Sequence, residues 1–107
     1  MELEQYSIVL VNLDPTIGSE IKKTRPCVIV SPNEINKFLR TIVVAPMTTN
    51  LKGYPTRIKV KYLQKKGMIA IDQIRTIDKS RILKTFDKLT RSEIQKCKDI
   101  IRETFVD

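Results

Sequence analysis

Histidine and tryptophan are absent from this sequence of 107 residues, and cysteine occurs twice. Without histidine, no mechanism can use an imidazole base, and no metal site can contain an imidazole ligand. Cys27 and Cys97 form no C-x-x-C pair, so a structural zinc site is not indicated. We expect two reduced, buried thiols, and the sequence alone leaves a bridge between them open.

Long hydrophobic runs are missing as well. The longest apolar stretches, at residues 8–11 and 42–47, have the length of strands and are far shorter than a membrane helix of roughly 20 residues. The first residues, MELEQYS, contain two acids and no apolar core, so they do not resemble a secretory signal peptide. We therefore expect a cytoplasmic protein with no membrane association.

The composition that is present fits a folded domain. Hydrophobic residues make up 41% of the sequence and charged residues 30%, a balance typical of soluble globular proteins. A chain of this length can bury one core but not two separate ones. We expect a single domain over residues 1–107.

Positive charge is concentrated in the middle of the sequence. The 20 lysines and arginines exceed the 12 acidic residues, giving a net charge of +8. Residues 21–91 hold 17 of the basic residues and 4 of the acidic ones, while both ends are slightly acidic. Such a surface attracts phosphate groups and makes binding salt-dependent. Nucleic acid is the favoured partner, although charge alone leaves DNA, RNA and an acidic protein open.

Short strands dominate the predicted elements. Apolar, β-branched or alternating runs predict strands at residues 6–13, 27–30, 41–45, 57–62, 68–77 and 83–86. Pro26 and Pro32 are expected to bound the strand at 27–30, and Pro46 is expected to end the strand at 41–45, because proline donates no hydrogen bond to a sheet. Polar loops are expected at 16–25 and 48–55, a turn at 64–67, and a short helix at 33–39. In the strand at 57–62, basic residues alternate with apolar ones, which predicts a basic outer face.

The C-terminal segment carries the clearest helix signal. Thr90 followed by Glu93 forms a capping box, and Leu89 with Ile94 fits a hydrophobic staple. The apolar residues that then recur at helical spacing are Ile94, Cys97, Ile101 and Phe105. Several short strands followed by one helix predict an α+β or mainly β fold, a small SH3-like barrel with a C-terminal α-helix.

Four motifs occur in a fixed order along the chain. They are L-D-P-T-I-G-S-E at residues 13–20, T-R-P at 24–26, P-M-T-T at 46–49 and D-Q-I-R-T-I-D-K-S-R-I at 72–82. Together, in this order and spacing, they resemble the MazF/PemK/Kid family of bacterial toxins over nearly the whole chain.

The resemblance implies properties that composition and periodicity do not show. Members of that family are endoribonucleases that cleave single-stranded RNA at short sequences and need no metal. They are homodimers that a labile, acidic antitoxin protein holds inactive. The resemblance therefore implies a CcdB/PemK-type barrel, RNA cleavage without a cofactor, and an antitoxin partner.

Individual residues match the family's functional positions. Arg25 of T-R-P matches the catalytic arginine, Thr48 of P-M-T-T matches the catalytic threonine, and Glu20 matches an acidic residue at the rim of the site. Asp72 and Gln73 match positions that contact RNA bases in some members. The other residues expected to bind RNA are Ser19, Lys22, Lys23, Thr49, Arg57, Lys59 and Arg75.

The sequence departs from the Kid branch of the family at two positions. Ser19 stands where that branch has a histidine, and Ala70 stands where it has an arginine. Of the His/Arg/Asp constellation proposed for that branch, Asp72 alone remains. We therefore favour catalysis by Arg25 and Thr48.

These residue types suit the cleavage of RNA, which carries its own nucleophile in the ribose 2′-OH. A guanidinium holds two phosphate oxygens and stays protonated at neutral pH, and a threonine hydroxyl can bind a third oxygen. We expect 2′,3′-cyclic phosphate and 5′-OH ends, with activity retained in EDTA. The general base stays open: Glu20 is one candidate, and Arg25 acting as acid and stabiliser, with Glu20 orienting it, is the other.

Two other functions compete with this prediction. CcdB-type toxins share the barrel and poison DNA gyrase, but residues 101–107 lack the aromatic-plus-small ending that such a toxin would be expected to have. A non-catalytic basic RNA-binding domain would shift RNA on a gel and leave it uncut.

Overall fold

The computed structural model describes residues 3–50, 53–62 and 65–106. Its strands are β1 (Ser7–Asn12), β2 (Thr24–Ile29), β3 (Thr41–Thr48), β4 (Arg57–Tyr62), β5 (Lys65–Ala70), β6 (Arg75–Asp78) and β7 (Ile82–Lys88). Its helices are the short α1 (Asn33–Asn36) and the long α2 (Arg91–Phe105), and the 3-10 turns η1 (Ile71–Gln73) and η2 (Lys79–Arg81) flank β6.

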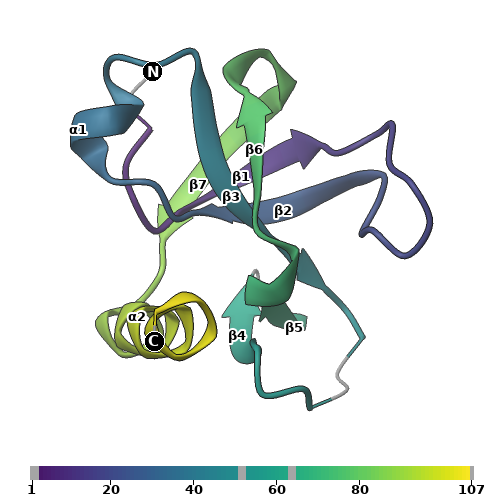
Figure 1. The fold of residues 1–107 in the computed structure, drawn as a ribbon, viewed down its shortest axis with the longest axis vertical. Coiled ribbons are helices and arrows are strands. Elements are labelled where there is room, and N and C mark those ends of the chain that lie inside the picture. The colour runs from purple at the N-terminus through teal and green to yellow at the C-terminus, as the bar shows by residue number, and fades with distance from the viewer. Residues whose placement is uncertain (1–2, 51–52, 63–64, 107) are drawn as a thin grey trace.

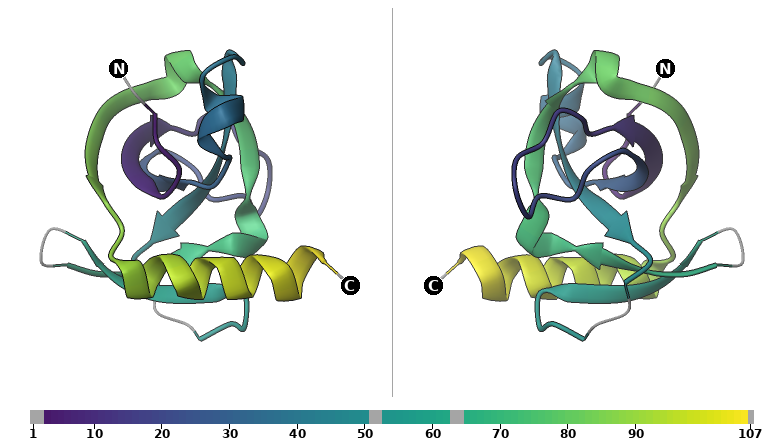
Figure 2. Two further views of the ribbon diagram at one scale, coloured as in Figure 1. Left: turned by 90° about the vertical axis from the view of Figure 1, so that its left-hand side faces the viewer. Right: turned by 90° about the vertical axis from the view of Figure 1, so that its right-hand side faces the viewer.

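Within the described residues, the strands form one antiparallel sheet. The order is β4-β5-β3-β2-β1-β7, and β6 pairs with β3 beside β5. The sheet curls strongly and stays open, and α2 lies across the end formed by β4 and β5 (Figures 1 and 2). This mainly β architecture with a C-terminal helix confirms the predicted fold class.

Two strands extend past the prolines that were expected to bound them. β2 begins at Thr24 and contains Pro26, which lies opposite Leu10 of β1 and precedes the first residue paired with β3. β3 continues through Pro46 to Thr48. Pairing of β3 with β6 ends at Val44 and pairing with β5 begins at Met47, so Pro46 lies in the gap between those two partners. A residue without an N–H is tolerated at such positions.

The strand predicted at 68–77 was wrong, because the chain turns a corner there. β5 ends at Ala70, η1 follows, and β6 begins at Arg75. β5 and β6 pair with the same edge of β3, one after the other, so the chain must step along that edge between them. The turn predicted at 64–67 was also wrong from Lys65 onward, since β5 begins at that residue, and positions 63–64 lie outside the described residues.

The remaining boundaries differ by smaller amounts. β1 is shorter than the predicted strand at 6–13, and β7 is longer than the strand predicted at 83–86. The helix predicted at 33–39 ends at Asn36. Phe38 is 83% exposed and Leu39 51%, so no apolar packing holds a second turn against the body.

The capping box at the start of α2 is confirmed. The Thr90 side chain accepts a hydrogen bond from the Glu93 N–H, and the Glu93 carboxylate accepts one from the Thr90 N–H. Cys97 is buried, with Ile94, Ile100 and Ile101 packed around it. The predicted apolar stripe ends before Phe105, which is 58% exposed.

The two faces of the sheet build two apolar clusters. The helix-side cluster joins α2 to residues such as Val28, Met47, Ile58, Val60 and Ile69. The inner cluster, inside the curl of the sheet, consists of Val9, Val11, Leu13, Cys27, Ile29, Ile42, Val44 and Ile77. Because side chains alternate along a strand, this division assigns each strand residue to one face.

Candidate active site

The register of β2 and β3 brings Arg25 and Thr48 to one edge of the inner face. Cys27 pairs with Pro46, and Ile29 with Val44. The last pair of this ladder is Cys27–Pro46, so Arg25 lies two residues before it on β2 and Thr48 lies two residues after it on β3. Both residues share the face of Cys27 and Val44, members of the inner cluster. The β2–β3 ladder stops at Pro46, and β3 pairs with β5 from Met47 onward.

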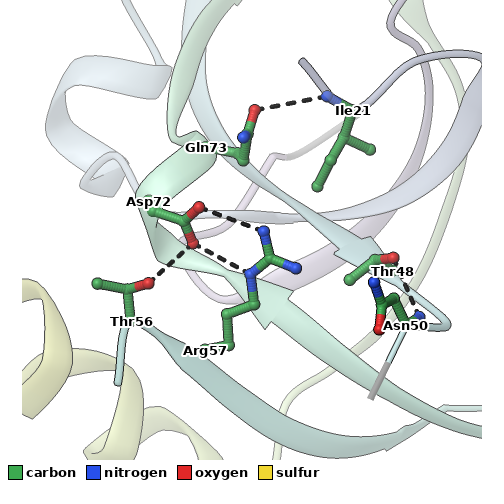
Figure 3. Close-up of polar contacts among 7 residues, drawn as sticks. All are labelled: Ile21, Thr48, Asn50, Thr56, Arg57, Asp72 and Gln73. Atoms are coloured by element: carbon green, nitrogen blue, oxygen red, sulfur yellow. Dashed lines mark hydrogen bonds and ion pairs between the residues drawn. The ribbon is translucent and has the colours of Figure 1, made fainter. Parts of the chain in front are cut away.

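The Arg25 side chain is held from one side. Its Nε donates to the carbonyl oxygen of Lys22 at 2.8 Å. Among the described residues, no other side chain or carbonyl accepts from its terminal nitrogens. The bond to Lys22 fixes the plane of the guanidinium, and the two terminal N–H groups stay available for an anion. Thr48 is half-buried, and its Oγ1 accepts a hydrogen bond from the Asn50 N–H at 3.2 Å (Figure 3).

The loop between β1 and β2 is closed on itself. The Lys23 N–H donates to Asp14 Oδ1 at 3.0 Å, and the Leu13 N–H donates to the Lys23 carbonyl at 3.1 Å. Glu20 Oε1 accepts from the Ile17 N–H at 2.6 Å. Gly18 lies between Ile17 and Glu20 and has a φ of 59°, a backbone conformation that favours glycine. Glu20 therefore shapes its own loop and is exposed to solvent at the same time.

Two arginines bind the base of this loop from the other side. Arg81 donates through Nη1 to the carbonyl oxygens of Asn12 at 3.2 Å and Asp14 at 2.7 Å. Arg75 donates through Nη1 to the carbonyl oxygen of Leu13 at 3.1 Å. Three consecutive carbonyls are thus held by guanidinium groups from β6 and η2. Arg81 was not among the predicted site residues. Its partners lie 67 and 69 positions away along the chain, so no local pattern indicates these contacts.

The charges of Arg75 and Arg25 both act on the Cys27 thiol. Burial raises the pKa of the Cys27 thiol to about 12, and the positive charges of Arg75 and Arg25 oppose that rise. Both guanidiniums therefore lie near the Cys27 side chain. Arg75 was predicted to guide RNA, and its contact with Leu13 assigns it a structural task as well.

A second polar group links β4 to η1. Arg57 makes two hydrogen bonds to the Asp72 carboxylate, at 3.2 and 3.3 Å, and the Thr56 hydroxyl donates to Asp72 Oδ1 at 3.0 Å (Figure 3). Burial tends to raise the pKa of Asp72, but the hydrogen bonds from Arg57 and Thr56 and the Arg57 charge lower it on balance. The Arg57 guanidinium also lies 4.9 Å from the centre of the Tyr54 ring. Asp72 and Arg57, both predicted to contact RNA, thus bind each other.

Gln73 connects this group to the loop. Its Oε1 accepts a hydrogen bond from the Ile21 N–H at 3.4 Å (Figure 3). The Gln73 amide N–H₂ group has no bond to the described residues. The loop, η1 and the ends of β2 and β3 therefore surround one polar region. The other predicted RNA-binding residues, all exposed, are Ser19, Lys22, Lys23, Thr49 and Lys59.

Neither cysteine belongs to this region as a reactive group. Both are free and buried, Cys27 in the inner cluster and Cys97 in the helix-side cluster. Burial raises the pKa of the Cys97 thiol to about 12, as it does for Cys27. In the described parts of the chain, no three histidine, cysteine, aspartate or glutamate side chains are grouped closely enough to hold a metal ion. No helix there has the length and apolar character needed to cross a membrane.

Comparison with known proteins shows the class to which this fold and site belong. Residues 4–105 match the family model described as PemK-like, MazF-like toxin of type II toxin-antitoxin system. The chain belongs to this family, as its motifs predicted.

Particular relatives extend the comparison. The chain is 36% identical over 104 residues to an endoribonuclease MazF of Staphylococcus saprophyticus. The aligned region covers 92% of this chain and 84% of that protein. Among solved structures, MazF of Deinococcus radiodurans superposes with a TM-score of 0.86 at 22% identity, covering 96% of both chains. A mycobacterial endoribonuclease in complex with its cognate antitoxin gives a TM-score of 0.80 at 19% identity, covering 94% of this chain and 92% of that one. At these identities the solved structures support the fold.

Proposed function

We propose that this chain is a sequence-specific endoribonuclease that cleaves single-stranded RNA without a metal ion. The observation that carries the proposal is that Arg25 and Thr48 both lie just beyond the β2–β3 ladder, on one face of the sheet, in a chain of the PemK-like, MazF-like toxin family. The 36% identical relative, whose name is endoribonuclease MazF, supports the same activity.

In the proposed reaction, the ribose 2′-OH attacks the adjacent phosphorus. The O2′–P bond forms, the P–O5′ bond breaks, and the products carry a 2′,3′-cyclic phosphate and a 5′-OH. Arg25 binds two phosphate oxygens through its terminal N–H groups and stabilises the charge that develops on them. The Thr48 hydroxyl donates to a third oxygen and fixes the orientation of the phosphate. Preorganised donors of this kind contribute about 3–4 kcal/mol each to the stabilisation of a transition state.

Two schemes account for the proton that leaves the 2′-OH and the proton that the departing 5′ oxygen gains. In the first, Glu20 accepts the 2′-OH proton, and the 5′ oxygen takes a proton from solvent water. Glu20 is exposed and has one carboxylate oxygen, Oε2, without a bond among the described residues. In the second scheme, the 2′-OH proton passes to solvent water, Arg25 serves as acid toward the departing 5′ oxygen and as stabiliser, and Glu20 orients the loop that carries Lys22, the partner of Arg25. Glu20→Gln separates the two, because the amide oxygen can still accept from the Ile17 N–H but cannot take a proton. A loss of cleavage with an unchanged KM assigns the base to Glu20.

Single-stranded RNA is the proposed substrate because bases must be unstacked before their edges can be read. The RNA-binding residues that we propose are Ser19, Lys22, Lys23, Thr49, Arg57, Lys59, Asp72, Gln73 and Arg75. Among these, the Gln73 amide N–H₂ group has no partner in the described residues and is a donor for a base edge.

We also propose that the chain forms a homodimer and is inhibited by an acidic antitoxin. Solved relatives include a mycobacterial endoribonuclease with its cognate antitoxin and a MazE-MazF structure from Deinococcus radiodurans. The concentration of positive charge in residues 21–91 favours an acidic partner. We expect the antitoxin to block the RNA site sterically, and undiminished cleavage by the antitoxin-bound protein would contradict this.

The test is primer extension on a long RNA of defined sequence, incubated with purified protein in EDTA. The proposal predicts cleavage at a short recurring sequence, and its loss in Arg25→Ala and Thr48→Ala variants. Lys98→Ala, a charge change on the exposed side of α2, is the matched control and keeps full activity. RNA that is bound and left intact would indicate a non-catalytic RNA-binding domain. Trapped double-strand breaks with DNA gyrase would indicate a gyrase poison instead.

A further inference from the structure

Three lysines share the face of the β4–β5 hairpin that points away from α2. Lys61 pairs directly with Lys66 across the two strands, and Lys59 lies two residues before Lys61 on the same side. Ile58 and Val60 point the other way into the helix-side cluster. Lys59, Lys61 and Lys66 are all exposed, so their ammonium groups leave the sheet on the side away from α2. We call these three residues the hairpin face.

The pairing of Lys61 with Lys66 is electrostatically unfavourable. The Lys61 N–H donates to Glu93 Oε2 at 3.4 Å, so it points away from β5 and the pair is of the non-hydrogen-bonded type. In antiparallel sheets this type brings opposite side chains closest together, and like charges placed there repel. The ion pairs of the described residues, Arg57–Asp72 and Lys88–Glu4, leave the hairpin face without an acidic partner. A bound anion would relieve this repulsion.

The hairpin face adjoins the candidate active site. Thr48 of β3 pairs with Met68 of β5, and Met68 pairs with Lys59 of β4, so the three residues form one row on one face of the sheet. Lys61 and Lys66 continue from that row away from Thr48. Lys59 and Lys61 are roughly 7 Å apart along the strand, a spacing comparable to that of successive phosphates in an extended nucleic acid strand.

We propose that the hairpin face binds the phosphate backbone of RNA on one flank of the cleavage point. The inference rests on the proposed endoribonuclease function and adds a binding surface outside its catalytic residues. An acidic protein is disfavoured as the occupant, because protein interfaces have an apolar or aromatic centre. The large exposed apolar residues of the described chain lie elsewhere: Ile17, Ile35, Phe38, Leu39, Tyr54, Leu83, Phe105 and Val106.

The test compares two RNAs that share one cleavage sequence, identified by primer extension. One is about 7 nucleotides long, and the other is extended on either side to about 20. Each carries a 2′-deoxy nucleotide at the cut, so that binding is measured without cleavage. The proteins are wild type, the double variant Lys61→Gln/Lys66→Gln, and the control Lys96→Gln/Lys98→Gln on the solvent side of α2.

Wild type and control should bind the long RNA more tightly than the short one, and the hairpin variant should lose that gain. The salt slope is the decrease in log affinity for each unit of log salt concentration, and the loss of two phosphate contacts should lower it by about 1.4. Between about 50 and 200 mM salt, the wild type should therefore lose about sevenfold more affinity for the long RNA than the variant does. Cleavage of the all-ribose short RNA should be the same in all three proteins. An equal effect of the variant on both RNAs, no effect at all, or the same effect in the control overturns the proposal.

Failure of the hairpin-face proposal and failure of the proposed endoribonuclease function give different results. If the wild type cleaves RNA and RNA length has no influence on binding, the proposal that the hairpin face binds RNA is wrong and the proposed endoribonuclease function is unaffected. If no RNA is cut by the wild type, the same binding series is run on RNAs of arbitrary sequence. A length gain lost in the hairpin variant then supports the surface alone, and its absence overturns the surface as well.

Discussion

Arginine at position 25 can hold two phosphate oxygens because its Nε is bound to the Lys22 carbonyl while its two terminal nitrogens bind no other described residue. Lysine keeps the positive charge but loses the fork. We predict that Arg25→Lys lowers kcat about 100-fold and changes KM little, because the lost interaction belongs to the transition state. Steady-state cleavage of a short RNA measures both constants. Activity within a few-fold of wild type would show that charge alone suffices at this position.

Asp72 gives a prediction that depends on pH. Its pKa is lowered in the folded chain, so the stability it provides is present above the unfolded pKa of about 3.9 and is lost as pH falls through the folded value. We predict that Asp72→Asn lowers the free energy of unfolding by about 1 kcal/mol at pH 7, since Arg57 loses its carboxylate partner. The difference should disappear at pH values well below 4, where wild-type Asp72 is also neutral.

Urea unfolding of the two proteins at both pH values is the measurement. If Asp72→Asn destabilises the protein equally in acid, the stabilisation comes from the shape of the Asp72 side chain and not from its charge.

At the residue scale, the sequence motifs indicated candidate side chains but not how those side chains contact one another. Arg25, Thr48, Asp72 and Gln73 were singled out by their motifs alone. That Asp72 binds Arg57 follows from the β4–β5 register and the corner at η1, which bring together residues 15 positions apart. No local pattern contains that information.

The loop between β1 and β2 depends on Arg81 at the scale of elements. Arg81 holds two carbonyls at the base of this loop, and the loop carries Glu20 and the Lys22 carbonyl that fixes Arg25. We predict that Arg81→Ala lowers kcat at least tenfold and costs about 1–2 kcal/mol of stability, because two charge-assisted hydrogen bonds are lost. Arg81→Lys should recover part of kcat, since an ammonium can still reach one carbonyl.

The measurement is cleavage kinetics at a temperature where circular dichroism shows both variants folded. Lys37→Ala, an exposed charge on the α1 side, is the control. Full activity of folded Arg81→Ala would show that Arg81 supports stability and not the site.

Elements were predicted well where their signal is local and poorly where it depends on neighbours. The capping box of Thr90 and Glu93 located the start of α2 because those contacts lie within one turn. Pro26 and Pro46 were misinterpreted because a proline ends a strand only if its missing N–H faces a partner, and the register decides that. The corner at η1 escaped prediction because residues 68–77 mix apolar and polar positions and contain no proline or glycine to mark a turn.

The two apolar clusters raise the question of whether the molecule unfolds as one unit. Cys27 and Cys97 report on different clusters, and burial raises the pKa of each thiol to about 12, so neither reacts while folded. We predict that both are labelled by a thiol reagent in parallel as urea rises, with the same midpoint, because domains of this size usually unfold in one step. Mass spectrometry of labelled peptides measures this. Earlier labelling of Cys97 would show that α2 detaches first.

At the scale of the whole molecule, the central claim is that the chain directs a ribose hydroxyl at its own phosphate between Arg25 and Thr48. Mass spectrometry of the fragments from one RNA, cut in EDTA, tests this most directly, with a second RNA carrying a single 2′-deoxy nucleotide at the cut. We expect 2′,3′-cyclic phosphate and 5′-OH ends on the first RNA and no cleavage of the second. A 5′-phosphate on the fragments, or cleavage of the deoxy RNA, would contradict it.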